Sequence, residues 1–349
     1  MFMCVAFMRS GAFQGEKNHS AGERIFEMTN GQIYRKTIGF SFRRLLWDLL
    51  SLVLLLAVST GGYLVGEKFF ENGPIGLVIG AIIGLIVMAL ILRFISYIYK
   101  AGQIAMMTRG VTEGELPDNV IAEGKKVVKE RFATVAVFFA VTGAIKGIFN
   151  QIGRGITKVG QSIGGDTGGS IGSAVSSVIQ TIINYLCDCC LGWVFYRRDV
   201  KPARAACEGA VLFFKHGKTF AKNMGRVFGI GLASLLVIGG AFTGVFYLIL
   251  QANPGIYESL SGYIAEAEFD ASSLLGSLLK NPAALPVVLA AIGGIIVWSF
   301  IHSNFIKPFV LTGVLRTYIA SGANDIPSEA SFAALDSKSA KFRKLHSEL

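Results

Sequence analysis

Six polar side chains recur at intervals of three and four residues in one otherwise apolar stretch: Ser173, Ser177, Gln180, Thr181, Asn184 and Asp188. On an α-helix this spacing places them on one face, so they predict a continuous polar stripe. Asp188 stands nine residues before Arg197, which is about 13 Å of helix at 1.5 Å per residue. If the helix crosses a membrane, a carboxylate at that depth costs about 2.5–3.5 kcal/mol, so it should face a bundle interior or a water-filled cavity.

Two interpretations of the stripe stay open. It could line a polar pathway or binding groove, or it could make interhelical hydrogen bonds worth about 0.6 kcal/mol each. We expect Lys146, on the preceding apolar run, to lie too far from Asp188 in depth for the two to pair.

Signatures of catalysis are missing from the sequence. It contains no His-Glu-x-x-His, no Gly-x-Ser-x-Gly and no Walker A motif. Cys187, Cys189 and Cys190 are spaced poorly for tetrahedral zinc, and we interpret them as small buried apolar residues. We therefore predict a protein that is not an enzyme, with no catalytic residues, no metal and no cofactor.

A glycine-rich segment, Gly153–Gly172, precedes the stripe. It lacks the Gly-Lys-Ser/Thr ending of a phosphate-binding loop. It could be a flexible external loop or a re-entrant segment that lines a cavity, and both alternatives stay open.

Composition indicates a membrane protein with several spans. Of the 349 residues, 52% are hydrophobic and only 16% charged, and the mean hydropathy is +0.54. About 25% charged is usual in soluble domains. In a soluble protein the net charge of +10 would suggest nucleic acid. Here it is better explained by basic residues kept on the cytosolic side, and we expect no nucleic-acid partner.

Six apolar runs have about the length needed to cross a hydrocarbon core of about 30 Å. The candidate spans are Leu45–Gly66, Pro74–Ile98, Phe132–Phe149, Ile171–Tyr196, Val227–Leu250 and Ala283–Ile306. The third is short and the fourth is weakly hydrophobic.

Basic residues fix the expected orientation. With the N-terminus inside, the four cytosolic segments hold four, seven, eight and six lysines and arginines. The opposite side holds four, namely Lys68, Arg154, Lys158 and Lys280. The positive-inside rule then predicts a cytoplasmic-membrane protein with both termini cytosolic.

The expected fold is all-α: a membrane helix bundle of three hairpins, each followed by a cytosolic amphipathic helix. We divide this single membrane domain into segments 28–131, 132–226 and 227–349. Residues 1–27 form a separate leader, in which Gly22-Glu23-Arg24 can be encoded by a purine-rich sequence resembling a ribosome-binding site. We therefore expect Met28 to be the true start.

A repeated phrase follows each hairpin. Pro117 precedes Glu123-Gly124, Pro202 precedes Glu208-Gly209, and Pro327 precedes Ala333-Ala334. Lys100 and Arg109, like Lys307 and Arg316, are nine residues apart, so the pattern predicts a degenerate internal repeat. The helices after the prolines could lie in the membrane interface or pack as elbows under the spans. The basic interfacial candidates are Lys215, Lys218, Lys222 and Arg226.

Three glycines, Gly76, Gly80 and Gly84, recur every four residues in the second predicted span. They predict close helix packing on one face. The neighbour could be a second copy of the chain or another span of the same chain, and we favour the latter.

Gly114-Glu-Leu-Pro117 followed by Glu123-Gly124 resembles a recurring feature of uncharacterised prokaryotic multi-span membrane proteins. A fainter similarity links the cysteine-rich stretch and Gly217–Phe220 to choline-transporter-like proteins. The resemblance implies a membrane location and no known chemistry.

Two functions remain. The first is a non-enzymatic membrane component that organises the envelope, binds lipids or regulates a partner through its basic cytosolic elbows. Its expected partners are the bilayer, anionic headgroups, and a protein partner or second copy. The second is a small-solute or ion transporter or channel that uses the polar stripe.

Overall fold

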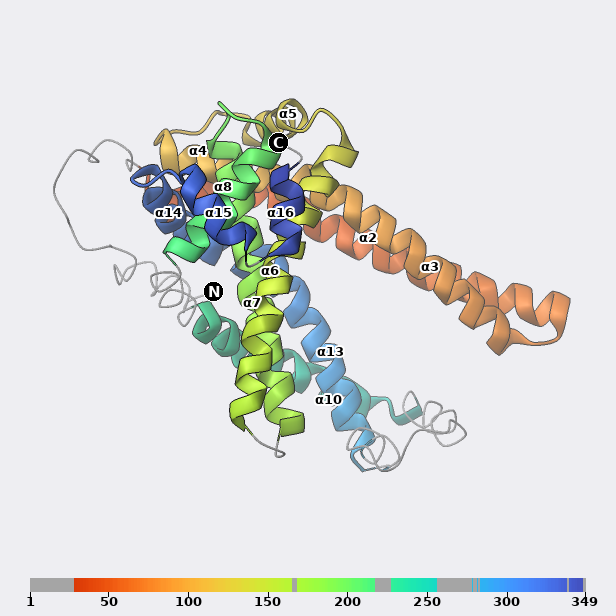
Figure 1. Ribbon diagram of the computed structural model, residues 1–349. Coiled ribbons are helices and arrows are strands. Elements are labelled where there is room, and N and C mark those ends of the chain that lie inside the picture. Colours follow the sequence, from red (N-terminus) through yellow and green to blue (C-terminus); the bar gives the residue numbers. More distant parts are fainter. Residues whose placement is uncertain are drawn as a thin grey trace. The chain divides into compact units, whose positions relative to one another are not determined.

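A computed structural model describes residues 28–164, 168–216, 227–255, 278, 281, 283–337 and 339–347, with backbone alone for residues 96, 135 and 152–179. All regular secondary structure in these residues is helical, as the sequence predicts (Figure 1). The chain forms two compact units. The first comprises residues up to 224 together with Pro308–Leu349, and the second is Gly225–Lys307. The predicted leader, residues 1–27, lies outside the described residues, and the expected segment boundaries stay predictions.

The first hairpin consists of two long antiparallel helices, α2 (Asn30–Phe70) and α3 (Gly73–Ile95) (Figure 1). A reciprocal cap starts α2. The Thr29 hydroxyl accepts the Gln32 amide at 3.3 Å, and the Gln32 side chain accepts the Thr29 amide at 2.8 Å. Two orphan donors of the first turn are thereby satisfied.

Glycines let the two helices of this hairpin approach closely. A Cβ atom on Gly80 would lie 2.6 Å from the Val58 carbonyl oxygen, and one on Gly84 would lie 2.8 Å from the Leu55 side chain. Gly76 likewise meets the backbone of Gly62. All three glycines of the four-residue pattern therefore pack against α2 of their own hairpin.

Beyond α3 the chain makes a five-residue π-helix, η1 (Ser96–Lys100), and then α4 (Ala101–Thr112) and α5 (Val120–Arg131). α4 is buried along most of its length. A Cβ atom on Gly124 of α5 would lie 2.9 Å from the Gly102 carbonyl oxygen of α4. The glycine of the first repeated phrase is thus where the elbow helix meets the end of the preceding hairpin.

The second hairpin consists of α6 (Val135–Gly164) and α7 (Gly168–Tyr196), which lie side by side (Figure 1). Residues 153–164 and 168–172 of the glycine-rich segment belong to these two helices, which disfavours the flexible-loop alternative for them. Residues 165–167, between the helices, lie outside the described part.

α8 (Pro202–Lys215) follows the second hairpin, with its proline in the first turn. Proline is favoured there because its missing N–H would have no helical partner. Every residue from Ala205 to Leu212 is buried. This elbow therefore packs within the protein, the second of the two alternatives drawn from the sequence.

The second unit contains α10 (Gly240–Ala252) and α13 (Leu285–Ile301), with the π-helices η3 (Leu235–Gly239) and η4 (His302–Ile306). A Cβ atom on Gly294 would lie 2.7 Å from the Gly239 carbonyl oxygen, so these helices also approach closely at glycine. The chain continues with α14 (Lys307–Ala323), α15 (Glu329–Asp336) and α16 (Ala340–Ser347).

The core of the first unit lies at helix ends and elbows. Its largest fully buried side chains come from the start of α2, from α4, from the ends of α5 and α7, and from α14 to α16. They include Phe40, Ile104, Phe132, Trp193, Phe195, Tyr318, Phe332 and Phe342. The middles of α2 and α3, in contrast, expose leucine, isoleucine and valine along their length.

Within the described residues, four helices are long and apolar enough to cross a membrane: Asn30–Phe70, Gly73–Thr112, Val227–Ala252 and Leu285–Ala323. A fifth span results if Val120–Arg131 and Ala136–Gln151, bent by 84° from each other, are taken together. The prediction of six spans is therefore wrong. The predicted third span begins beside this bend, and glycines and polar side chains dilute the apolar character of the predicted fourth, on α7.

The glycine contacts of the first hairpin give a matched test. Gly62→Ala should destabilise the protein, because the added methyl meets the backbone of Gly76 and Gly80. Gly61→Ala should be neutral or stabilise by up to about 1 kcal/mol, because nothing lies within 4 Å of its Cβ position and alanine favours helix. Thermal unfolding in detergent measures both. Equal melting temperatures for the two variants would contradict this packing.

Candidate functional site

The predicted polar stripe has a varied environment on α7. Ser173 and Ser177 lie where only the backbone is described. Gln180 and Asn184 are exposed, Thr181 is half-buried and Asp188 is buried. The charged end of the stripe is therefore the part that the protein encloses.

Asp188 forms an ion pair with the first hairpin. Its carboxylate lies 2.6 Å from the Lys100 Nζ, and the two side chains are 5% and 32% exposed. Lys100 is the last residue of the π-helix η1. Asp188 precedes Arg197 by nine residues, the interval that also separates Lys100 from Arg109 and Lys307 from Arg316. The ion pair thus joins two positions that each precede an arginine by the same nine residues.

A cavity of about 280 Å³ surrounds this ion pair, and we call it the Lys100 cavity. Arg93, Lys146 and Asn184 line it together with Lys100 and Asp188. Three cations thus share the wall with one carboxylate. The structure places Lys146 and Asp188 on the wall of one cavity. The sequence had predicted that the two residues lie at different depths and do not pair.

Aromatic and apolar side chains complete the wall of the Lys100 cavity. Phe138, Phe139, Ile145 and Leu191 line it. The Arg93 guanidinium lies 5.2 Å from the centre of the Phe139 ring, a cation–π distance. Such a wall lowers the local dielectric, which strengthens the field of the cations.

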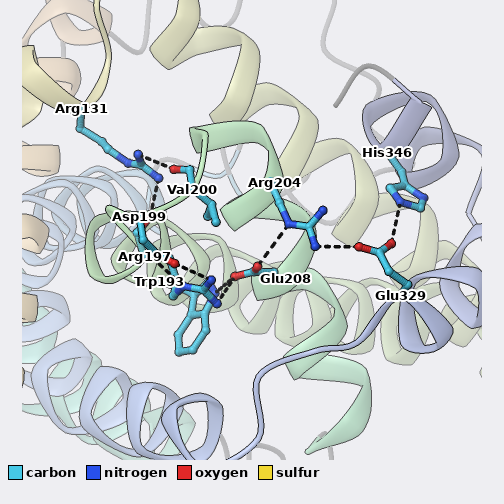
Figure 2. Close-up of polar contacts among 9 residues, drawn as sticks. All are labelled: Arg131, Trp193, Arg197, Asp199, Val200, Arg204, Glu208, Glu329 and His346. Atoms are coloured by element: carbon cyan, nitrogen blue, oxygen red, sulfur yellow. Dashed lines mark hydrogen bonds and ion pairs between the residues drawn. The ribbon is translucent and has the colours of Figure 1, made fainter.

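A second polar cluster centres on Glu208 of α8 (Figure 2). Its side chain is 2% exposed and accepts hydrogen bonds from the Trp193 indole at 3.2 Å and from Arg197 at 2.9 Å. Burial raises the pKa of Glu208, whereas the hydrogen bond from Trp193 and the charge of Arg197 lower it. The cluster fixes α8 against the end of α7.

The cluster continues toward the C-terminal helices (Figure 2). Arg204 lies 3.7 Å from Glu208 and 2.7 Å from Glu329 of α15. Glu329 in turn lies 3.7 Å from His346 of α16. A chain of polar contacts therefore links α8 to the tail.

Arg131, at the end of α5, closes the C-terminus of α7. Its guanidinium donates to the carbonyl oxygens of Val194 at 2.9 Å, Arg197 at 2.8 Å and Val200 at 2.8 Å. The last carbonyls of a helix have no partner within it. This arginine supplies partners from the neighbouring elbow.

The Glu-Gly phrase explains part of this design. Glu123 of α5 lies 3.7 Å from Arg109, as Glu208 of α8 lies 2.9 Å from Arg197. In both copies the glutamate contacts the arginine that ends the preceding helix. The repeated phrase was the sequence signal for this role, but we had assigned no function to its glutamate.

The basic interfacial candidates are only partly described. Lys215 contacts Asp325, and this pairing lowers the pKa of Asp325. Lys218, Lys222 and Arg226 lie outside the described residues. Lys215 is thus occupied by a carboxylate of its own chain.

The described cysteines show no sign of metal binding. Cys189, Cys190 and Cys207 are buried, and burial raises the pKa of Cys207 to about 12. Among the described residues, no group of three or more His, Cys, Asp or Glu side chains could hold a metal ion.

Compared with family models, curated proteins and solved structures, the chain matches none. The resemblance drawn from the short glutamate-glycine phrase gains no support there. What the structure defines is a class: an all-α protein with four or five candidate membrane spans.

The two glutamates of the repeated phrase allow a paired test. Glu208→Gln should cost about 1–3 kcal/mol of stability, because it removes the buried counter-charge of the 12% exposed Arg197, which keeps only its pair with the exposed Asp199 at 2.8 Å. Glu123→Gln should cost less than about 1 kcal/mol, because its more exposed pair is 3.7 Å apart. Urea unfolding in detergent compares them. Similar losses for both variants would show that the Glu208 cluster is not the stronger anchor.

Proposed function

We propose that this chain is a non-enzymatic, multi-pass protein of the cytoplasmic membrane that associates with anionic lipids on its cytosolic side. The observation that carries the proposal is a collar of aromatic and basic side chains at one end of the apolar hairpin α2–α3. The collar comprises Phe42, Arg43, Trp47, Arg93 and Phe94, all of them exposed.

The dimensions of the hairpin support this placement. Trp47 and Phe69 are separated by 22 residues of α2, which is about 33 Å at 1.5 Å per residue. A bilayer hydrocarbon core is about 30 Å thick. Phe69 and Phe70 are exposed beside Lys68 at the other end. The hairpin thus has polar or aromatic anchors at both expected interfaces.

The register of the two helices places the collar residues at one level. Gly62 lies against Gly76, and Leu55 lies against Gly84. Continued in the same antiparallel register, Arg93 and Phe94 lie level with the turn that holds Arg43 and Trp47. Cations and amphipathic rings at one level suit a headgroup region.

The basic bias of the sequence supports cytosolic termini, since the collar end of α2 is its N-terminal end. The buried carboxylates of Asp188 and Glu208 are held in ion pairs, which supports structural or binding roles for them. A protein partner or second copy of the chain would then bind from the cytosolic side.

Collar cations should make stability depend on lipid charge. In nanodiscs, the wild-type protein should melt at a higher temperature with phosphatidylglycerol than with phosphatidylcholine, and salt should reduce this difference. Lys36 is exposed on α2 about two turns before Arg43. Lys36→Gln with the collar variant Arg43→Gln should remove much of the difference, at about 1 kcal/mol for each cation near an anionic surface. Lys68→Gln, one cation at the other end, is the control. An unchanged difference in the double variant would contradict the proposed role.

One observation favours transport as the alternative function. Asn184 and Asp188, two members of the polar stripe, line the Lys100 cavity. A cavity with excess positive charge would accept a small anion. Such a pathway would have to continue along α7 through Ser177 and Ser173.

The alternative predicts flux. In proteoliposomes loaded with a chloride-sensitive dye, a transporter or channel should pass chloride, and Asp188→Leu should abolish or strongly alter that flux at the same protein level. Thr181→Val, in the same stripe but outside the cavity wall, serves as the comparison. No flux from the wild-type protein would leave the lipid-binding function as the better supported one.

A further inference from the structure

We propose that the Lys100 cavity binds the phosphate group of an anionic membrane lipid. The proposal rests on the lipid-interacting function above and extends it from the exposed collar to a cavity whose wall shares Arg93 with the collar. The supporting observation is that three cations, one carboxylate and an aromatic wall meet between the first and second hairpins.

The charges of the cavity favour an anion. Asp188 is paired with Lys100 at 2.6 Å. In the part of the chain that the structure describes, neither Arg93 nor Lys146 makes an ion pair, and both side chains are exposed. Arg44 of α2 also lies within electrostatic range of Asp188. After Lys100 neutralises Asp188, the cationic side chains of Arg93 and Lys146 therefore remain able to bind an anion.

The identities of these donors suit phosphate. Arginine offers a planar fork that can bind two phosphate oxygens, and lysine acts as a point charge. Arg93 is oriented by its contact with the Phe139 ring. An oriented guanidinium loses less freedom when it binds, so the site is partly preorganised.

The volume suits a headgroup. At about 280 Å³ the cavity falls just below the range of about 300–1,000 Å³ typical of pockets that enclose a whole small ligand. A lipid would place its phosphate inside and keep its acyl chains outside. Basic pockets between transmembrane helices on the cytoplasmic side are a known form of lipid site.

The mouth of the cavity lies where acyl chains could pass. Gly143 of α6 is exposed, and nothing lies within 4 Å of its Cβ position. Phe94 and Val137, the sequence neighbours of the lining residues Arg93 and Phe138, are also exposed apolar residues of α3 and α6. An open glycine flanked by apolar helix surface gives a lipid, rather than a fully water-soluble anion, a route to the cations.

Native mass spectrometry of the full-length protein in detergent tests the site with phosphatidylglycerol and phosphatidylcholine as probes. The wild-type protein should retain phosphatidylglycerol preferentially. Arg93→Gln and Lys146→Gln should each weaken retention about tenfold, because each removes a charge-assisted contact. Arg93→Lys should restore part of it. Equal retention of both lipids by the wild-type protein would overturn the proposal.

Closing the mouth gives an independent test. Gly143→Leu should reduce retention while the melting temperature stays unchanged, because the new side chain enters open space. Gly61→Leu, also in open space but near the far end of the first hairpin, should retain lipid as the wild-type protein does. Undiminished retention in Gly143→Leu and in both cation variants would place the lipid elsewhere.

Inorganic phosphate distinguishes the two sources of the anion. Displacement of phosphatidylglycerol by millimolar phosphate would support the same site with a free anion as its ligand. Failure of inorganic phosphate to displace phosphatidylglycerol would support the lipid as the ligand. The Lys36→Gln, Arg43→Gln double variant separates the two proposals: it should keep its lipid adducts even where it loses lipid-dependent stability, so either proposal can fail alone.

Discussion

The buried ion pair between Glu208 and Arg197 is the contact on which the arrangement of the first unit depends. Arg197 follows the last turn of α7, and Glu208 lies on the elbow α8, so their pairing fixes how the chain turns after the second hairpin. Because the pair is almost fully removed from water, neither charge can be left alone without a large loss of stability. Trp193 satisfies a further lone pair of the same carboxylate, and Arg204 extends the charge to α15. The tail therefore depends on the same elbow.

After the first hairpin, different residues likewise hold an elbow helix against the helix before it. Gly124 meets Gly102 as Gly209 meets Cys190, so each elbow helix lies close against the helix that precedes it. The copies differ nine residues before their arginines, where one has Lys100 and another has Asp188. This difference in sign lets the two hairpins attract each other at equivalent points. The cavity that surrounds the pair lies between these two hairpins.

Much of the helical architecture could be predicted from the sequence, because apolar length and the basic bias are strong signals. The elbows were also predictable, since proline and a following Glu-Gly recur at similar spacing. The number of spans was not predictable from apolar runs alone. The run after Arg131 begins beside a sharp bend, and the glycine-rich segment continues as helix rather than as a long loop.

The candidate site was predictable only in part. A polar stripe ending in Asp188 followed from helical periodicity, but its partner Lys100 lies 88 residues earlier in the sequence. Spacing along one helix carries no information about which helix packs against it. The sequence alone predicts no site role for Arg93 or Lys100, because nothing in their spacing indicates that they face Asp188. Two of the three described π-helices, η1 (Ser96–Lys100) and η4 (His302–Ile306), add a historical consequence. A Ser-x-x-x-Lys sequence coincides with η1 and recurs, one residue later, at Ser303–Lys307, and each π-helix widens one helical turn by a residue. The predicted internal repeat would account for a widened turn at similar points of the first and third hairpins, as the trace of an ancestral hairpin that already carried the extra residue. The α-helical α7 would then have lost it after duplication.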